Sequence, residues 1–176
     1  MLGFLFRRLT ASPPRGKALF DAVTVEARRP FWYEGGGVPD TLDGRFAVLT
    51  TVAALVLVRL EREGAEGDRL SVAFTERFIE VMESEHRELG LGDPTLGKTV
   101  RKLVSVLAKR TELWRSTSND EADWTKAARA SLYRIDAPVD ALCNSVAALR
   151  SLVQRLSTIP IEGFEQGKLD ERPIRP

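Results

Sequence analysis

Hydrophobic positions along this chain recur at the three- and four-residue spacing of an α-helix. The strongest example follows Asp40, where Leu42, Phe46, Leu49 and Ala53 open an unbroken stripe that runs to Leu60. Further apolar residues around that stripe make the segment apolar on nearly all sides, which is typical of a helix enclosed by other helices. The same spacing predicts helices over residues 14–28, 41–60, 68–89, 94–115, 121–135 and 137–159.

The ends of these segments carry the residues that start and stop helices. Acidic residues stand at the start of five of them: Asp40, Asp68, Asp93 and Asp136 are the expected N-caps, and the fifth helix begins directly after Asp120. Pro160 closes the last segment. A strand competes only in the β-branched part of residues 41–60, where the unbroken three- and four-residue spacing favours a helix. The predicted fold is therefore all-α, a single domain of about six helices.

The predicted organisation has three parts along the chain. Residues 1–13 form an N-terminal arm, residues 14–160 the helical domain, and residues 161–176 an extended tail with at most one short turn. Between the first and second helices the stretch "RRPFWYEGGGVPDTLDGRF" is rich in glycine, proline and aromatic residues. We expect it to be a long ordered connection rather than a helix.

Composition narrows the classes of protein to which this chain can belong. The chain has 176 residues, 43% of them hydrophobic and 29% charged, and its net charge is +1. A balance of this kind is typical of a globular protein in water and argues against a DNA-binding protein. The single cysteine, Cys143, stands beside Leu142 in an apolar helix pattern, so we expect a buried structural thiol.

The predicted location is the cytoplasm. The longest uncharged run has 13 residues, whereas a spanning helix needs about 20. In the arm the apolar residues Leu2, Phe4, Leu5 and Phe6 precede two arginines, which is the reverse of a secretory signal. The arm could pack on the protein, or could touch a bilayer with the arginines at the headgroups.

One motif raises the possibility of nucleotide binding. The stretch "GDPTLGKT" at residues 92–99 fits the phosphate-binding pattern G-x-x-x-x-G-K-[ST]. That pattern functions after a buried strand, and the preceding residues 68–89 are predicted to be helical and are highly charged near their end. We therefore expect a turn between two helices, with Asp93 as N-cap and Pro94 at the first helical position. A nucleotide-binding protein using residues 92–99 remains the alternative hypothesis.

The chain contains few residues suited to catalysis or metal binding. Glu83 and His86 have the Glu-x-x-His spacing of di-iron bundles, but His86 is the only histidine. A zinc site is excluded by the same lack of ligands. A histidine-dependent hydrolase would have to use His86, which stands among charged residues at a helix end and is expected to face solvent. The sequence predicts no catalytic residue, no cofactor and no metal ligand.

Two stretches are candidates for contact with another molecule. The adjacent aromatics Phe31, Trp32 and Tyr33 either plug the end of the helical bundle or form an apolar cleft for another chain. The helix over 94–115 carries one basic side, which is either solvated or in contact with anionic lipid, ribosomal RNA or an acidic partner. The cations of that side are Lys98, Arg101, Lys102, Lys109 and Arg110.

Two blocks of sequence resemble the ubiquinol–cytochrome c chaperone family of alphaproteobacteria and mitochondria. The first is "RRPFWYEGGGVPDTLDGRFAVL" at residues 28–49, and the second is "MESEHRELGLGDPTLGKTVRKL" at residues 82–103. The chain departs from the family's pattern at Ser131, where asparagine is usual, and at Pro94, where an apolar residue is more usual. The positions that match are Arg28, Pro30, Tyr33, Gly37, Val38, Pro39, Asp40, Thr41, Asp43, Gly44, Arg45, Phe46, Arg87, Glu88, Gly90, Gly92, Asp93 and Lys98.

The resemblance implies a non-catalytic assembly chaperone that binds newly made cytochrome b and supports assembly of the ubiquinol–cytochrome c reductase. It also implies a position peripheral to the inner membrane, with the ribosome exit region or a small partner subunit as possible partners. A helical interaction module with another client is a further alternative. We expect Trp32→Ala and Arg45→Glu to weaken client binding while leaving the thermal midpoint nearly unchanged. The residues expected to contact a client or partner are Arg29, Phe31, Trp32, Tyr33, Asp40, Asp43, Arg45, Asp93, Lys98, Arg101 and Lys102.

Overall fold

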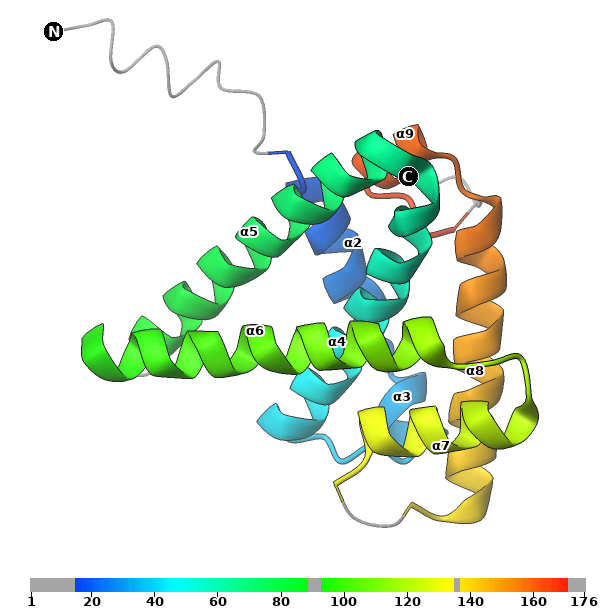
Figure 1. Ribbon diagram of the computed structural model, residues 1–176. Coiled ribbons are helices and arrows are strands. Elements are labelled where there is room, and N and C mark those ends of the chain that lie inside the picture. The colour runs from blue at the N-terminus through cyan, green and yellow to red at the C-terminus, as the bar shows by residue number, and fades with distance from the viewer. Residues whose placement is uncertain (1–14, 89–92, 135–136, 171–176) are drawn as a thin grey trace, which may run out of the picture.

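The computed structural model describes residues 15–88, 93–134 and 137–170, and the regular structure within these ranges is entirely helical. Six of the helices have eleven or more residues, which confirms the all-α prediction (Figure 1). The elements are α2 (Lys17–Ala27), α3 (Phe31–Glu34), α4 (Leu42–Leu60), the 3₁₀ turn η1 (Glu61–Glu63), α5 (Gly64–Glu88), α6 (Asp93–Ser116), α7 (Glu121–Leu132), α8 (Val139–Thr158) and α9 (Ile161–Glu165).

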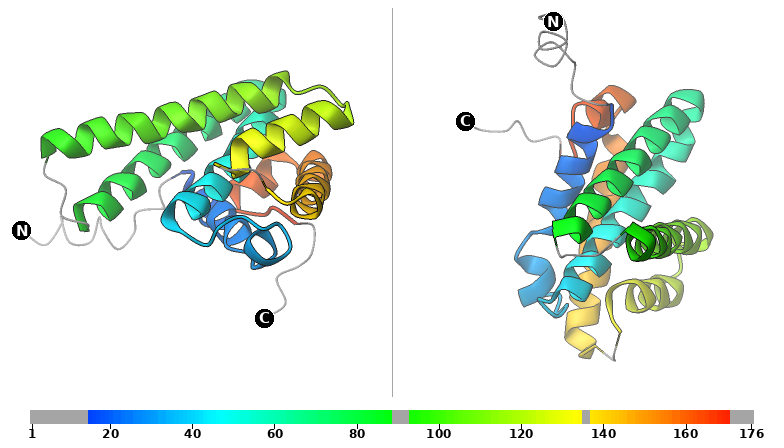
Figure 2. Two further views of the ribbon diagram at one scale, coloured as in Figure 1. Left: turned by 90° about the horizontal axis from the view of Figure 1, so that it is seen from below. Right: turned by 90° about the vertical axis from the view of Figure 1, so that its left-hand side faces the viewer.

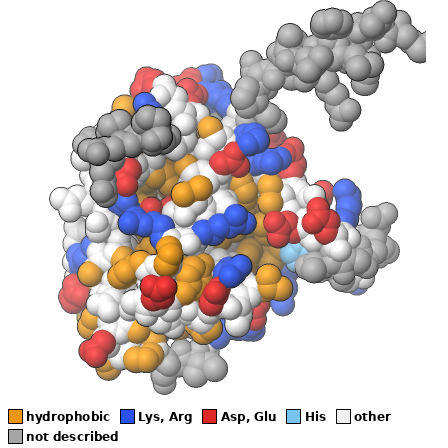
Figure 3. Space-filling view, turned by 180° about the vertical axis from the view of Figure 1, so that it is seen from behind, with side chains coloured by type: hydrophobic (Ala, Val, Ile, Leu, Met, Phe, Trp, Pro, Cys, Tyr) orange, Lys and Arg blue, Asp and Glu red, His pale blue; other side chains and the backbone are white. Residues whose placement is uncertain are grey.

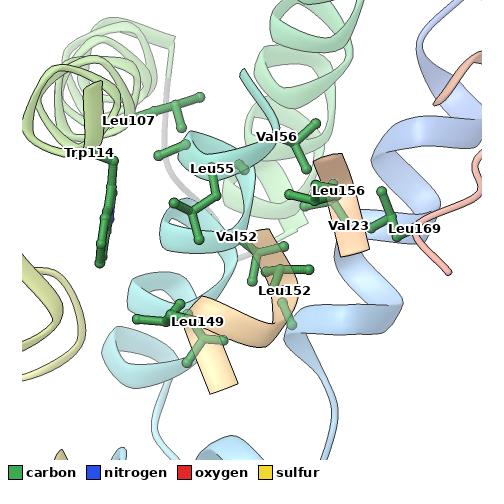
Figure 4. Packing of buried hydrophobic residues seen from close by; sticks show 14 of the residues in the cluster. Val23, Val52, Leu55, Val56, Leu107, Trp114, Leu149, Leu152, Leu156 and Leu169 are labelled. Carbon is green, nitrogen blue, oxygen red and sulfur yellow. The ribbon is translucent and has the colours of Figure 1, made fainter. Parts of the chain in front are cut away.

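Helix α4 lies at the centre of the molecule, as its sequence predicts. Figure 2 shows α6 and α7 on one side of α4, α2 and α3 on the other, and α8 along a third side. Val48, Val52 and Val56 of α4 are fully buried. In Figure 4, Val52 and Leu55 are surrounded by leucines of α8 and by residues of α2 and α6. Burial on all sides explains why this segment is apolar on all sides.

The start of α4 differs from the prediction. Its N-cap is Thr41 rather than Asp40, and the Thr41 hydroxyl accepts a hydrogen bond from the backbone N–H of Gly44 at 3.2 Å. Asp40 instead forms an ion pair with Arg45. Gly44 is required at its position, because a Cβ there would stand 1.9 Å from the carbonyl oxygen of Pro39. A side chain at residue 44 would push the connection away from the helix.

The turn between α4 and α5 is tighter than predicted. The expected start of the second of these helices was Asp68, but α5 begins at Gly64, directly after η1. Gly64 has φ +58°, and a Cβ on Gly67 would lie 2.0 Å from the carbonyl oxygen of Leu60. The two glycines therefore allow an abrupt reversal, and Asp68 becomes an exposed residue within α5 rather than its cap.

The remaining helix ends agree with the prediction in part. Asp120 caps α7 by accepting a hydrogen bond from the N–H of Ala122 at 3.2 Å, but α7 ends at Leu132 rather than at 135. The N-cap of α8 is Pro138. The expected cap Asp136, the N-terminal arm 1–13, residues 89–92 and the side chain of Asp93 lie outside the described residues.

The C-terminal segment packs against the helical core. The one short turn expected there is α9, and the Phe164 side chain of α9 is fully buried, as is most of Leu169. The Arg59 guanidinium lies 5.4 Å from the centre of the Phe164 ring and donates hydrogen bonds to the carbonyls of Leu156 and Ile159. Residues 161–170 are therefore part of the packed domain rather than an extended tail. Among the described helices, none has the length and hydropathy needed to cross a membrane.

Candidate functional site

The aromatic connection between α2 and α4 contains one helical turn, α3, where an irregular connection was predicted. Trp32 is only 2% exposed, and its indole Nε1 donates a hydrogen bond to the carbonyl of Glu26 at 2.9 Å. The Tyr33 hydroxyl donates to the carbonyl of Ala27 at 2.8 Å, and burial raises the pKa of Tyr33. Both rings thus close off the end of α2 by binding its last carbonyls. This geometry supports the plug interpretation for two of the three aromatics.

Phe31 is placed differently, because its side chain is 40% exposed and packs edge-on against Trp32 at 5.8 Å between ring centres. It lies at the mouth of a cleft of about 380 Å³ between α2, α3 and α8. The buried carboxylate of Glu26 lines this cleft and forms ion pairs with Arg29 at 3.3 Å and Arg155 at 3.2 Å. On this face of the molecule, Lys and Arg side chains run across the middle with hydrophobic side chains above and below them (Figure 3).

Asp40, Asp43 and Arg45 are exposed and paired charged residues of residues 29–45, called the α3–α4 segment below. Arg45 donates hydrogen bonds to both carboxylate oxygens of Asp40, at 2.6 and 3.2 Å, and this lowers the pKa of Asp40. Asp43 forms an ion pair with Arg134 at the start of the connection to α8. Exposed pairs of this kind contribute little to stability. Either member of such a pair can therefore form an ion pair with a binding partner instead, at a small cost in folding free energy.

Helix α6 presents the predicted basic side, with one correction. Lys98, Arg101, Lys102 and Lys109 are exposed, and none of the four has an ion-pair partner within the described part of the chain. Arg110 does not belong to this side. It points into the protein, where it donates hydrogen bonds to the Thr50 hydroxyl and to the carbonyl of Ser131, and burial lowers its pKa to about 10. The four exposed residues are called the α6 basic face below.

The structure contains a groove between α5 and α6 that the sequence reasoning did not anticipate. In Figure 1, α5 and α6 lie oblique to each other, close together at the left and apart at the right, where the end of α4 lies between them. The groove has a volume of about 760 Å³. Its walls are mainly apolar, and Val72, which contributes to them, is 59% exposed. The apolar lining residues are Leu57, Val72, Ile79, Val104, Leu107 and Ala108.

The rim of the α5–α6 groove is acidic. Asp68 and Glu76 of α5 are exposed and form no ion pair with any described residue. At one end Arg115 binds Glu61, with an Nε to Oε2 distance of 2.9 Å, and also binds Glu112. The hydrogen bonds from Arg115 lower the pKa of Glu61. The unpaired charge around the groove is therefore negative, whereas the unpaired charge on the α6 basic face is positive.

The described residues give no support to a nucleotide site at residues 92–99. The residues before the match are helical up to Glu88, and Gly97 to Thr99 lie within α6. A phosphate-binding loop of this pattern needs a strand at that place, and the prediction that residues 68–88 are helical is confirmed.

The environment of Cys143 also differs from the prediction. The cysteine is exposed on α8, while its neighbour Leu142 is buried. Adjacent residues of a helix point about 100° apart, so a cysteine beside a buried leucine can face water.

The burial of Trp32 changes the expectation for its replacement. Trp32→Ala removes a core side chain together with a hydrogen bond, and should lower the free energy of unfolding by about 3–5 kcal/mol. Phe31→Ala, one residue earlier and partly exposed, should cost about 1 kcal/mol or less. Urea denaturation followed by circular dichroism measures both values. Equal losses of unfolding free energy in the two variants would contradict the assignment of Trp32 as buried and Phe31 as partly exposed.

Comparison with known proteins places the chain in a family. The model of the family described as "Ubiquinol-cytochrome C chaperone" matches residues 34–171. Among solved structures, the crystal structure of the Cbp3 homolog from Brucella abortus is similar in fold, with a TM-score of 0.75 and 22% sequence identity. The similarity covers 98% of this chain and 97% of that one. No curated protein matches. With a family match over most of its length, the chain belongs to the ubiquinol–cytochrome c chaperone family.

Proposed function

We propose that this protein is a non-catalytic assembly chaperone that binds newly made cytochrome b and supports assembly of the ubiquinol–cytochrome c reductase. Family membership supports the general role. The observation that carries the proposal is the open apolar groove between α5 and α6. An apolar groove on a protein surface is the usual site for an apolar segment of another chain.

The groove suits a client that is unstable in water. A membrane subunit that has not yet reached its assembled state exposes apolar side chains, which associate with any accessible apolar surface. Val72, Ile79 and Val104 offer such a surface from two helices. The groove volume accommodates several side chains of a client rather than an entire helix, so the contact is suited to transient holding and release.

The α3–α4 segment is proposed as a contact for a second partner, such as a small partner subunit or the ribosome exit region. Figure 2 shows α2 and α3 on the side of α4 opposite to α6, so this segment and the groove face different directions. The partly exposed Phe31 supplies an apolar anchor, and the surrounding charges supply polar contacts. The proposed residues are Arg29, Phe31, Asp40, Asp43 and Arg45, with the buried Trp32 and Tyr33 holding α3 in place.

The α6 basic face is proposed as the contact with the anionic surface of the inner membrane, which would keep a cytoplasmic protein near its client. Unpaired cations are attracted to anionic headgroups, at about 1 kcal/mol for each residue near the surface. Lys109 directly follows the groove residue Ala108, so a membrane bound at this face would lie next to the groove. Asp93 precedes this face, and its side chain lies outside the described residues.

Replacing exposed groove residues should reduce assembled cytochrome b. The double variant Val72→Asp with Ala108→Asp places two carboxylates where a client would have to desolvate them, so it should fail to restore cytochrome b in a strain lacking the gene. Cytochrome b is quantified by its absorbance difference spectrum in isolated membranes. Val25→Asp is the matched control, because Val25 is also exposed, at 70%, but lies on α2 away from the groove.

Two results would contradict this proposal at different levels. Normal reductase in the strain lacking the gene would remove the assembly role altogether. A fully active groove variant beside an active Val25→Asp control would leave the role intact and move the client to another surface. The thermal midpoint of each purified variant shows whether a loss arises from unfolding.

The α6 basic face can be tested with vesicles. Lys98→Gln, Arg101→Gln and Lys102→Gln together remove about 3 kcal/mol of attraction, so binding to vesicles containing anionic lipid should weaken on the order of a hundredfold. The wild-type interaction should also weaken as salt rises. Arg62→Gln, Lys126→Gln and Lys168→Gln make the same change in charge elsewhere and should have little effect. Equal effects of the two triple variants, or binding to ribosomal RNA without binding to vesicles, would contradict the membrane contact.

A further inference from the structure

The α5–α6 groove combines an apolar floor with unpaired negative charge on one wall. Leu57 of α4 belongs to the apolar floor, Val72 and Ile79 of α5 to one wall, and Asp68 and Glu76 stand on the same helix at the rim. The two carboxylates lie eight residues apart, which corresponds to about 12 Å along a helix. An occupant that fits this groove carries apolar side chains next to closely spaced cations.

The first residues of this chain have that composition. Leu2, Phe4, Leu5 and Phe6 are followed at once by Arg7 and Arg8, and residues 1–14 contain no acidic side chain. These residues lie outside the described part of the structure, so their place must be inferred from where the described chain begins.

The first described residues, Arg15 and Gly16, lie against α5. Arg15 forms ion pairs with Glu66 of α5 at 3.0 Å and with Glu165 of α9 at 2.6 Å. Gly16 has φ +89°, and a Cβ there would stand 2.6 Å from the backbone of Ala73, so the chain touches α5 directly. Ala73 lies about 100° around the α5 axis from the groove residue Val72. The first residues are therefore tethered beside the helix that forms one wall of the groove.

The tether is long enough to reach the groove. Residues 9–14 span up to about 20 Å when extended, and the diameter of a helix with its side chains is about 10–12 Å. Arg7 and Arg8 can therefore pass around α5 to the acidic rim, with Phe4 and Phe6 reaching the apolar floor beyond it. Because the arm is part of the same molecule, its effective concentration at the groove is in the millimolar range, and weak affinity is sufficient for occupancy.

We propose that residues 2–8 of this chain dock in the α5–α6 groove as an internal occupant. Arg7 and Arg8 pair with Asp68 and Glu76, and the phenylalanines cover the apolar lining. This docking does not depend on which protein is the client. If the groove also holds the client of the proposed function, the arm is displaced when the client binds.

Disulfide trapping in the full-length chain tests the docking. Cys143→Ser removes the native thiol, Gly3→Cys places a thiol on the arm, and Ala108→Cys places its partner in the groove. The matched control is Lys109→Cys, also exposed and one residue further along α6, but turned about 100° away from the groove. Under mild oxidation, docking predicts a yield of intramolecular disulfide at least about tenfold higher for position 108 than for position 109.

Charge reversal separates specific docking from chance encounters. Arg7→Glu with Arg8→Glu should lower the yield at position 108 severalfold, and adding Asp68→Arg with Glu76→Arg should restore it. Equal yields at positions 108 and 109, or a yield unaffected by charge reversal, would overturn the proposal. Equal yields in solution, together with protection of the arm thiol by anionic vesicles, would assign the arm to a membrane instead. None of these outcomes depends on cytochrome b binding.

Discussion

The structure depends on the enclosure of α4. A helix of 19 residues with apolar side chains on nearly every side cannot lie at a surface, so other helices must cover it from all directions. Helices α2, α6, α7 and α8 all pack against it, and buried side chains from several of these helices meet at Val52 and Val56 (Figure 4). The C-terminal segment also packs against the end of α4. Arg59 of α4 donates a hydrogen bond to the last turn of α8 and lies over the ring of Phe164.

The groove follows from the way α4 ends. Two glycines turn the chain so sharply after Leu60 that α5 leaves at an angle to the helices packed along α4. Helix α6 then crosses back over α4, and the wedge between α5 and α6 has the last turns of α4 as its floor, with Leu57 exposed to it. An apolar surface that would otherwise be covered is thus left open by the geometry of one turn.

Local sequence patterns predicted the helices well because each segment shows helical spacing of its own hydrophobic residues. They predicted side-chain roles less well, since those depend on neighbouring elements. Trp32 stands between an exposed phenylalanine and a half-buried tyrosine, and its burial depends on the end of α2. Arg110 directly follows the exposed Lys109 and is partly buried because α4 and α7 meet there. The groove could not be found from single helices, because its walls come from two of them and its existence depends on their angle. Val72 and Ile79 beside the main stripe of α5 were the only local sign.

Charge is distributed unevenly although the net charge is only +1. Unpaired cations gather on the outer side of α6 and unpaired carboxylates at the groove rim on α5, while the α3–α4 segment is balanced by ion pairs. The proposed membrane contact and the proposed client groove therefore lie on surfaces of opposite unpaired charge.

The most direct test of the groove as the client site is photo-crosslinking to cytochrome b during its synthesis. A photoreactive amino acid is introduced at Val72 in the groove or at Val25 on α2, both exposed positions of the same residue type. The account predicts a cytochrome b adduct from position 72 and little or none from position 25. An adduct from position 25 alone, or equal adducts from both, would contradict it.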